Sequence, residues 1–315
     1  MERALGMTKE ELNDYFLAYR KTLADSEQLR LANSVWFKDD GSLDPNRDFL
    51  QTNADVYGAE LYGAPFDQET LEEINGWVRE KTDGMIPKIL EEIPGNVVMY
   101  LINALAFDAK WEEIYKESNV WPDAFTRADG TKRNATFLYG EESRYLETEE
   151  ATGFLKPYQG GRYAFLALLP REGLSPEDCL EALDGETLTE LIRNPQQETV
   201  FTALPKFETA YEAELSDVLK SLGMELPFDA DRADFSGIGT SPAGNIYISR
   251  VLHKTFLAVD EAGTRAGAAT AVEMPTKSAE PVEVKRVYLD RPFVYMLVDC
   301  KTGLPLFIGT MTDPT

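Results

Sequence analysis

The stretch EAGTRAGAATAVEMPTKSAEPVEVKRVYLDRPF occupies residues 261–293, and its first ten residues are almost all small. In a strand, side chains alternate between the two faces, so the even-numbered positions from 264 to 270 would share one face. These positions hold only small side chains, on Thr264, Ala266, Ala268 and Thr270. Such a row is narrow enough to slide between neighbouring strands and under a covering helix.

The character of the sequence changes after Val272. Residues 274–281 read MPTKSAEP, and Pro275 and Pro281 bias the residues before them toward extended conformations. An exposed, extended segment with a basic residue, here Lys277, is what a protease cleft accepts. From composition alone, the alternative interpretation is a surface linker between two strands.

The order of these residues resembles the reactive-centre loop of the serpins, a family of serine protease inhibitors. The match is to the family's hinge pattern, in which a glutamate, a glycine and a threonine precede a run of alanines that ends in threonine. The hinge residues are Glu261, Gly263, Thr264, Ala266, Gly267, Ala268, Ala269 and Thr270. Further matches, from about residue 5 to the C-terminus, include FDAKW (107–111), RVLHKTFLAVDEAGT (250–264), RPFVYML (291–297) and PLFIGTM (305–311).

The resemblance implies an α+β fold with a large central mixed β-sheet, additional sheets and about seven to nine helices. It implies one serpin domain over residues 1–315, with an exposed reactive-centre loop at 261–285. The family normally begins with further helices and a strand that precede the first residue of this chain. One of those helices packs beneath the main sheet, and we find no counterpart for it in this sequence.

Hydrophobic periodicity and turn residues place the other elements. Apolar spacing predicts a helix from Thr8 and an amphipathic helix over 68–81. The near-continuous apolar run 97–106 predicts a strand buried on both faces. Other expected elements are a strand at 29–37, a helix at 213–222, a helical turn from 246 leading into the strand HKTFLAVDE, and a hairpin formed by 293–298 and 305–310.

Charge and composition exclude several classes of protein. The net charge of −24 and pI near 4.4 argue against binding to nucleic acid or to an anionic membrane. Residues 8–27, which correspond to the helix that binds heparin in some serpins, are acidic overall, so heparin binding is not expected. Cys179 and Cys300 are expected to be free thiols. No signal peptide or transmembrane run is visible. An extracellular or cell-surface location is implied by the resemblance alone.

Residue constellations for catalysis are missing from the sequence. The single histidine, His253, has no GxSxG nucleophile motif to serve, and zinc would need several His or Cys ligands. GIGTSPAG (237–244) fits no nucleotide fingerprint. The acidic cluster at 229–234 lacks the glycine and closing glutamate of an EF-hand. We therefore expect no enzymatic activity, no cofactor and no metal.

Other positions acquire roles only through the resemblance. His253 resembles the family's shutter histidine, which pairs with an asparagine on the neighbouring strand, by position Asn103. Glu261 and Lys206 resemble the ion pair at the top of the sheet, the breach, and Trp111 resembles the tryptophan that packs there. An ordinary core tryptophan and a surface salt bridge are the plain alternatives.

The implied activity is suicide inhibition of serine proteases by a monomer that forms a covalent complex. Counting the usual hinge length from Glu261 places the scissile bond at Lys277-Ser278, which predicts trypsin-like targets. Cleavage at Val272, Met274 or Thr276 would instead suit elastase-, chymotrypsin- or subtilisin-like proteases. A non-inhibitory serpin-fold binding protein is the alternative from another functional class.

Overall fold

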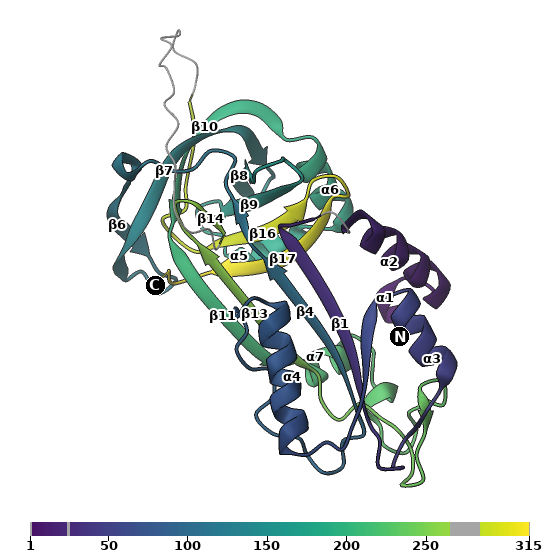
Figure 1. The fold of residues 1–315 in the computed structure, drawn as a ribbon. Helices are drawn as coiled ribbons and strands as arrows, with labels where there is room; N and C mark the ends of the chain where they lie inside the picture. Colours follow the sequence, from purple (N-terminus) through teal and green to yellow (C-terminus); the bar gives the residue numbers. More distant parts are fainter. Residues whose placement is uncertain (1, 24–25, 265–283, 315) are drawn as a thin grey trace. The chain divides into compact units, whose positions relative to one another are not determined.

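The computed structural model describes residues 2–23, 26–264 and 284–314 (Figure 1). They form two compact units, one from residues 1–107 and 210–256 and the other from 108–209 and 257–315. Five of the predicted hinge residues, from Ala266 to Thr270, and the predicted scissile bond Lys277-Ser278 lie outside the described residues. Glu261, Gly263 and Thr264 lie within them. The single domain expected over 1–315 stays a prediction.

The first unit contains a three-stranded sheet of order β3-β1-β4, in which β1 pairs parallel to β3 and antiparallel to β4. Its elements are α1 (Glu2–Leu5), α2 (Lys9–Leu23), β1 (Leu29–Lys38), β2 (Asp44–Pro45), α3 (Arg47–Asp55), β3 (Ala59–Ala64), α4 (Gln68–Lys81), β4 (Met99–Phe107), α7 (Ser216–Ser221), η2 (Leu226–Phe228) and β12 (Gly239–Thr240).

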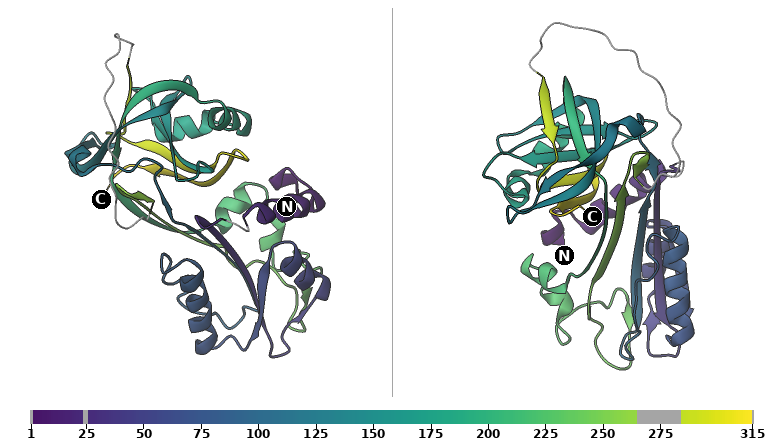
Figure 2. Two further views of the ribbon diagram at one scale, coloured as in Figure 1. Left: turned by 45° about the horizontal axis from the view of Figure 1, so that its top comes forward. Right: turned by 90° about the vertical axis from the view of Figure 1, so that its left-hand side faces the viewer.

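Helix α4 covers one face of this sheet, as Figure 1 and the right-hand view of Figure 2 show. The Asp67 side chain accepts the Thr70 N–H at 3.0 Å and caps the first turn. Ile74 and Val78, one helical turn apart, are fully buried in a cluster that includes Ile102 of β4. The bounds predicted for this helix, 68–81, are confirmed.

Strand β4 departs from the sequence prediction of burial on both faces. Ile102 and Ala104 are buried in the α4 cluster, whereas Leu101 is 59% exposed and Asn103 is also exposed. The two faces of a strand differ because alternate side chains point to opposite sides. The prediction was wrong because an apolar run does not reveal that α4 covers only one face among the described residues.

Two further predictions needed correction in this unit. Helix α7 begins at Ser216 because β11 (Phe207–Glu214) extends to Glu214, whose carboxylate accepts the Ser216 N–H at 3.0 Å. The helical turn expected from 246 is absent, since residues 246–251 are neither helix nor strand. Their backbone donors bond to other segments, for example Ile248 N–H to the Pro227 carbonyl at 2.8 Å.

The second unit is built on an eight-stranded sheet of order β15-β10-β7-β8-β9-β16-β17, with β6 paired to β7. Its elements are β5 (Ala109–Lys110), η1 (Glu117–Asn119), β6 (Val120–Thr126), β7 (Lys132–Glu147), β8 (Ala151–Pro157), β9 (Tyr163–Pro170), α5 (Pro176–Ala182), α6 (Gly185–Arg193), β10 (Gln196–Pro205), β14 (Gly263–Thr264), β15 (Lys285–Tyr288), β16 (Phe293–Asp299) and β17 (Leu304–Met311).

The core of the second unit lies where α5 and α6 pack against β8, β9 and β16. All eight residues of β9 and all seven of β16 are buried, which explains their almost unbroken apolar sequence. Cys179 and Ile192 bring the two helices into the same cluster as Met296. The predicted hairpin is confirmed, with Phe293 opposite Met311 in the β16–β17 pair.

A four-stranded sheet of order β11-β13-β14-β5 draws strands from both units. Its long strands are β11 (Phe207–Glu214) and β13 (Leu252–Val259), and each passes from one unit into the other. The short strands β14 and β5 pair with one another antiparallel. The seven α-helices of the described residues, this large mixed arrangement and the additional sheets confirm the predicted fold class.

Candidate functional site

The predicted hinge begins in a tight turn that joins β13 to β14. Val259 pairs antiparallel with Thr264, and the Asp260 N–H donates to the Gly263 carbonyl at 2.9 Å. The Asp260 carboxylate accepts the N–H groups of Ala262 and Gly263 at 2.8 and 3.0 Å. An aspartate that bonds the backbone two and three residues ahead stabilises a turn without needing a large apolar side chain.

Gly263 lets this turn lie directly against β5. The register places Gly263 opposite Lys110 and Thr264 opposite Ala109. A Cβ atom at position 263 would collide with the Ala109 carbonyl oxygen. The hinge glycine is therefore required by the close approach of two backbones, which explains one residue of the pattern in physical terms.

Thr264 is already a buried sheet residue. Its side chain is 1% exposed, and its hydroxyl lies 2.5 Å from the hydroxyl of Tyr158. The Tyr158 ring stacks on Trp111 with centroids 4.5 Å apart, and burial raises the pKa of the Tyr158 phenol. The polar atom of Thr264 is thus satisfied, and its small side chain fills the space beside the ring.

Trp111 and Tyr115, which we call the hinge clamp, hold three successive carbonyls of the turn. The Trp111 indole N–H donates to the Asp260 carbonyl at 2.9 Å, and its backbone N–H donates to the Ala262 carbonyl at 2.9 Å. The Tyr115 N–H donates to the Glu261 carbonyl at 3.0 Å. Trp111 is completely buried, so it acts on the turn from inside the unit.

Lys206 and Glu261 form an ion pair, with Nζ 2.5 Å from Oε2. The two side chains are 35% and 40% exposed, so water screens much of the attraction. The hydrogen bond from Lys206 nevertheless lowers the pKa of Glu261 below 4.5. The pair therefore tethers the first hinge residue to the segment between β10 and β11. The role of this pair in inhibition stays a prediction.

A second, buried ion pair lies beneath the hinge clamp and escaped the sequence interpretation. Lys156 Nζ on β8 lies 2.7 Å from Glu142 Oε1 on β7, with side chains 4% and 9% exposed. The ammonium is 4.3 Å from the Tyr115 ring centroid and 5.4 Å from that of Trp111. Burial raises the pKa of the Glu142 carboxyl. The one signal in the sequence is a lysine inside the apolar stretch Phe154–Tyr158.

Asn103 and His253, the predicted shutter pair, have other partners among the described residues. The Asn103 amide donates to the Asn33 side-chain oxygen at 2.8 Å, and the His253 ring meets Tyr211 edge-on at 6.3 Å. Both side chains are exposed, and the hydrogen bond predicted between them is not formed in the part of the chain that the structure describes. Their assignment to one functional unit stays a prediction.

Comparison with known proteins identifies the family. A family model described as Serpin (serine protease inhibitor) matches residues 1–314. The chain belongs to the serpin family. Serpin-Z2A of Triticum aestivum is 33% identical over 314 residues, which span 95% of this chain and 78% of the relative.

Solved serpin structures resemble this serpin closely. The thermophilic serpin tengpin in its native state is 46% identical, with a TM-score of 0.92, and the match covers 99% of this chain and 81% of tengpin. Tengpin in its latent state is 44% identical, with a TM-score of 0.87, over 100% of this chain and 84% of the other. The described strands thus correspond more closely to the native form.

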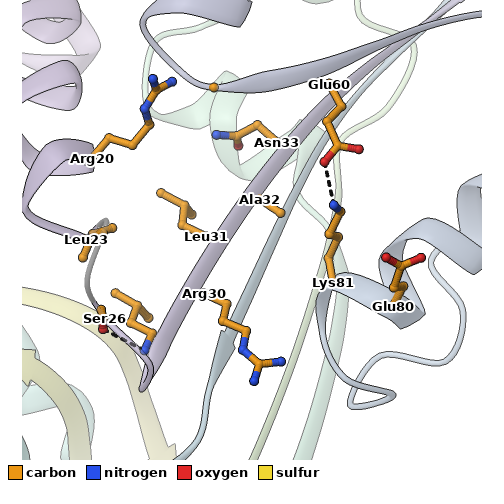
Figure 3. Close-up of a pocket in the computed structure, with 12 residues that line it drawn as sticks. Arg20, Leu23, Ser26, Arg30, Leu31, Ala32, Asn33, Glu60, Glu80 and Lys81 are labelled. Atoms are coloured by element: carbon orange, nitrogen blue, oxygen red, sulfur yellow. Dashed lines mark hydrogen bonds and ion pairs between the residues drawn. The ribbon is translucent and has the colours of Figure 1, made fainter.

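A pocket of about 470 Å³ lies in the first unit of the serpin (Figure 3). Charged side chains, among them Arg20, Arg30 and Lys81, share its lining with Leu31 and other apolar groups. Figure 3 shows Lys81 directed at Glu60, with which it forms an ion pair of 2.6 Å. Lys81 thus faces an acidic neighbour rather than a row of reactive side chains, and we do not place the function there.

Residues 2–23, 26–264 and 284–314 contain no group of three or more His, Cys, Asp or Glu side chains that could hold a metal ion. In the same part of this serpin, no helix is long and apolar enough to span a bilayer.

Proposed function

We propose that this serpin is a suicide-type inhibitor of serine proteases and traps its target by adding its cleaved loop to the sheet as a strand. Support comes above all from β14, whose residues Gly263 and Thr264 already lie between β13 and β5 in sheet register. The first rung of the new strand is therefore present before cleavage. The small residues that follow in the sequence meet the steric condition for its extension.

The chemistry is an interrupted proteolysis. The protease serine oxygen attacks the carbonyl carbon of Lys277, the bond to the Ser278 nitrogen breaks, and that nitrogen leaves as an amine after receiving a proton from the protease histidine. The product is an ester between Lys277 and the protease. Water would normally hydrolyse this ester, so insertion of the freed segment has to distort the protease first.

Continuing the register of β14 without a bulge predicts the partners of the inserted strand. Since Val259 pairs with Thr264, position 266 would lie opposite Leu257 and position 270 opposite His253. On the other side, Ala109 pairs with Thr264, so position 270 would lie opposite Asn103. Thr270 would then sit between the two predicted shutter residues, which gives them a shared role in the inserted form.

The same register explains why small residues are needed. Thr264 is 1% exposed, and positions 266, 268 and 270 follow it on the same face of the strand. Ala266, Ala268 and Thr270 would add little bulk to that face, which is buried at Thr264 and exposed further along, at Asn103 and His253. Insertion of roughly ten residues would add ladder hydrogen bonds worth about 1 kcal/mol each.

We place the scissile bond at Lys277-Ser278 and infer a trypsin-like target, because trypsin-like proteases cleave after basic residues. Cleavage after Val272, Met274 or Thr276 by an elastase-, chymotrypsin- or subtilisin-like protease is the second candidate. Both use the same loop and the same insertion. We further propose that the inhibitor acts as a monomer outside the cell or at its surface.

Incubation with trypsin tests this proposal. We expect a covalent complex that survives boiling in SDS, together with a cleaved fraction whose new N-terminus is Ser278. Degradation without a complex would contradict inhibition, and a complex joined at another residue would overturn the assignment of Lys277.

Thr264→Arg is the matched control for insertion. A long cation cannot replace a threonine that is 1% exposed and bonded to Tyr158 without disturbing the first rung. The variant should still be cleaved after Lys277 but should behave as a substrate. Full inhibition by Thr264→Arg would refute trapping by strand insertion.

A further inference from the structure

We propose that Lys156, held in place by Glu142, is a positioning residue that keeps the hinge turn in register and so sets how often cleavage ends in a trapped protease. This inference rests on the proposed inhibitory function. It concerns residues that lie in β7 and β8, outside the predicted loop, and it makes a buried ion pair part of the trap.

Folding stability alone does not explain the ion pair of Lys156 and Glu142. Lys156 and Glu142 are 4% and 9% exposed, so both charges have lost most of their water. A buried pair gains little net stability over apolar side chains of the same size, because desolvation offsets the attraction. The neighbours of Lys156 in β8, Phe154 and Leu155, are buried apolar residues, and an apolar residue would suit the same strand. A lysine here therefore calls for another explanation.

The position of the ammonium supplies that explanation. It lies 4.3 Å from the Tyr115 ring centroid and 5.4 Å from the Trp111 ring centroid, within the range of cation–π attraction for both. Glu142 fixes the ammonium from the opposite strand at 2.7 Å. The cation thus orients both rings of the hinge clamp at once, which an apolar side chain could not do electrostatically.

The hinge clamp connects the oriented rings to the turn through hydrogen bonds. The Trp111 indole N–H, which belongs to a ring that the cation contacts, donates to the Asp260 carbonyl at 2.9 Å. The backbone N–H groups of Trp111 and Tyr115 donate to the carbonyls of residues 262 and 261 at 2.9 and 3.0 Å. These carbonyls lie in the turn that sets Val259 opposite Thr264. The path from Lys156 to the first rung of the new strand consists of one ring contact and one hydrogen bond.

Register matters because insertion competes with deacylation. The next rung can form only in molecules whose turn is in register, and the apparent insertion rate scales with that fraction. Loosening the clamp would lower the fraction without changing the loop sequence that the protease binds. We therefore expect Lys156 to affect the partition between trapping and release, and to leave the rate of the first encounter unchanged.

The test compares Lys156→Met/Glu142→Gln, which removes both charges and leaves no unpaired buried charge, with Lys156→Arg, which keeps a cation over the rings. For each, the stoichiometry of inhibition of trypsin and the second-order rate constant are measured. The double variant should raise the ratio of cleaved to trapped inhibitor roughly tenfold at an unchanged encounter rate. Lys156→Arg should stay within about threefold of the wild type.

If the ion pair had only a structural role, the double variant would show a different pattern. Its urea midpoint before cleavage, its second-order rate constant and its trapped fraction would all fall together. Lys220→Met is the matched control, because Lys220 lies 5.4 Å from the Phe228 ring in the other unit. It should leave the partition unchanged. The proposal would be overturned if the double variant and the wild type had the same ratio of cleaved to trapped inhibitor. It would also be overturned if Lys156→Arg raised this ratio as much as the double variant does.

Two further results keep the outcomes distinct. If the double variant does not fold, Tyr115→Leu removes one ring while both charges stay, and it should also favour release; a normal partition would overturn the proposal. If wild-type protein forms no SDS-resistant complex, the proposed function fails. If the wild type traps trypsin and the variants trap it equally well, only the role of Lys156 is refuted.

Discussion

At the scale of single residues, the described hinge is held mainly by hydrogen bonds and packing. Asp260 ties the turn to itself, Trp111 and Tyr115 hold its carbonyls, and Tyr158 bonds Thr264. The ion pair of Glu261 with Lys206 adds a partly exposed electrostatic tether outside this set. The contribution of that tether can be separated from the rest by its pH dependence.

Glu261→Gln should lower the free energy of unfolding of the uncut protein by up to about 1 kcal/mol at pH 7, because the pair is partly exposed. The pKa of Glu261 is lowered from 4.5 in the folded state, so the stabilisation is complete above 4.5. It is lost as the pH falls through the lowered pKa. Urea unfolding of wild type and variant from pH 7 to pH 3 should therefore show midpoints that converge in acid.

The exposed residue Glu141 on β7 provides the control for this measurement. Glu141→Gln should give a small difference from the wild type that does not follow the titration of Glu261. A Glu261→Gln effect that persists undiminished at pH 3 would show that the side chain stabilises the turn by something other than charge.

The sequence alone predicted some residues of this site and missed others. Gly263 and Thr264 were found because their order is unusual and local, and the structure supplies the reason in the close contact with β5 and Tyr158. Lys156 and Glu142 were missed because their meaning depends on two rings that are distant in sequence. A lone lysine in an apolar strand indicates burial with a partner, but it cannot name the partner.

At the scale of elements, β14 is the shortest part of the sheet that the hinge enters, together with β5. It comprises only Gly263 and Thr264 in the described residues, flanked by β13 and β5. Local patterns predicted α4 to the residue because its cap and its apolar spacing lie within the helix itself. They failed for the faces of β4, since coverage of a strand depends on what other segments pack against it.

His253 offers a direct reading of whether β14 extends. It is the only histidine of the chain, so its imidazole NMR signal needs no assignment, and it is exposed in the structure. After cleavage at Lys277, a new strand with position 270 opposite His253 should shift this signal. It should also protect the ring from broadening by a soluble paramagnetic agent.

The comparison for that experiment is nicked Thr264→Arg, in which the first rung is disturbed. Its histidine signal should stay at the position seen in the uncut protein and remain accessible. If the wild-type signal also stays unchanged and accessible after nicking, the loop has not entered the sheet in the register set by β14.

At the scale of the whole molecule, the proposed inhibitor is less stable before cleavage than after it. About ten new ladder bonds at about 1 kcal/mol each correspond to roughly 15 °C in melting temperature for a chain of this size. Calorimetry before and after limited trypsin treatment measures this difference. A nicked form that melts at the temperature of the intact form would leave no driving force for the trap.

The order of β15, β16 and β17 after the loop has a consequence for the cut molecule. A break at Lys277-Ser278 leaves these three strands on the shorter piece, where β15 pairs with β10 and six of the seven buried residues of β16 pair with β9. The shorter piece therefore supplies three strands of the eight-stranded sheet. The spent inhibitor is thus a two-polypeptide assembly whose halves complement each other, and only denaturation should release the C-terminal peptide.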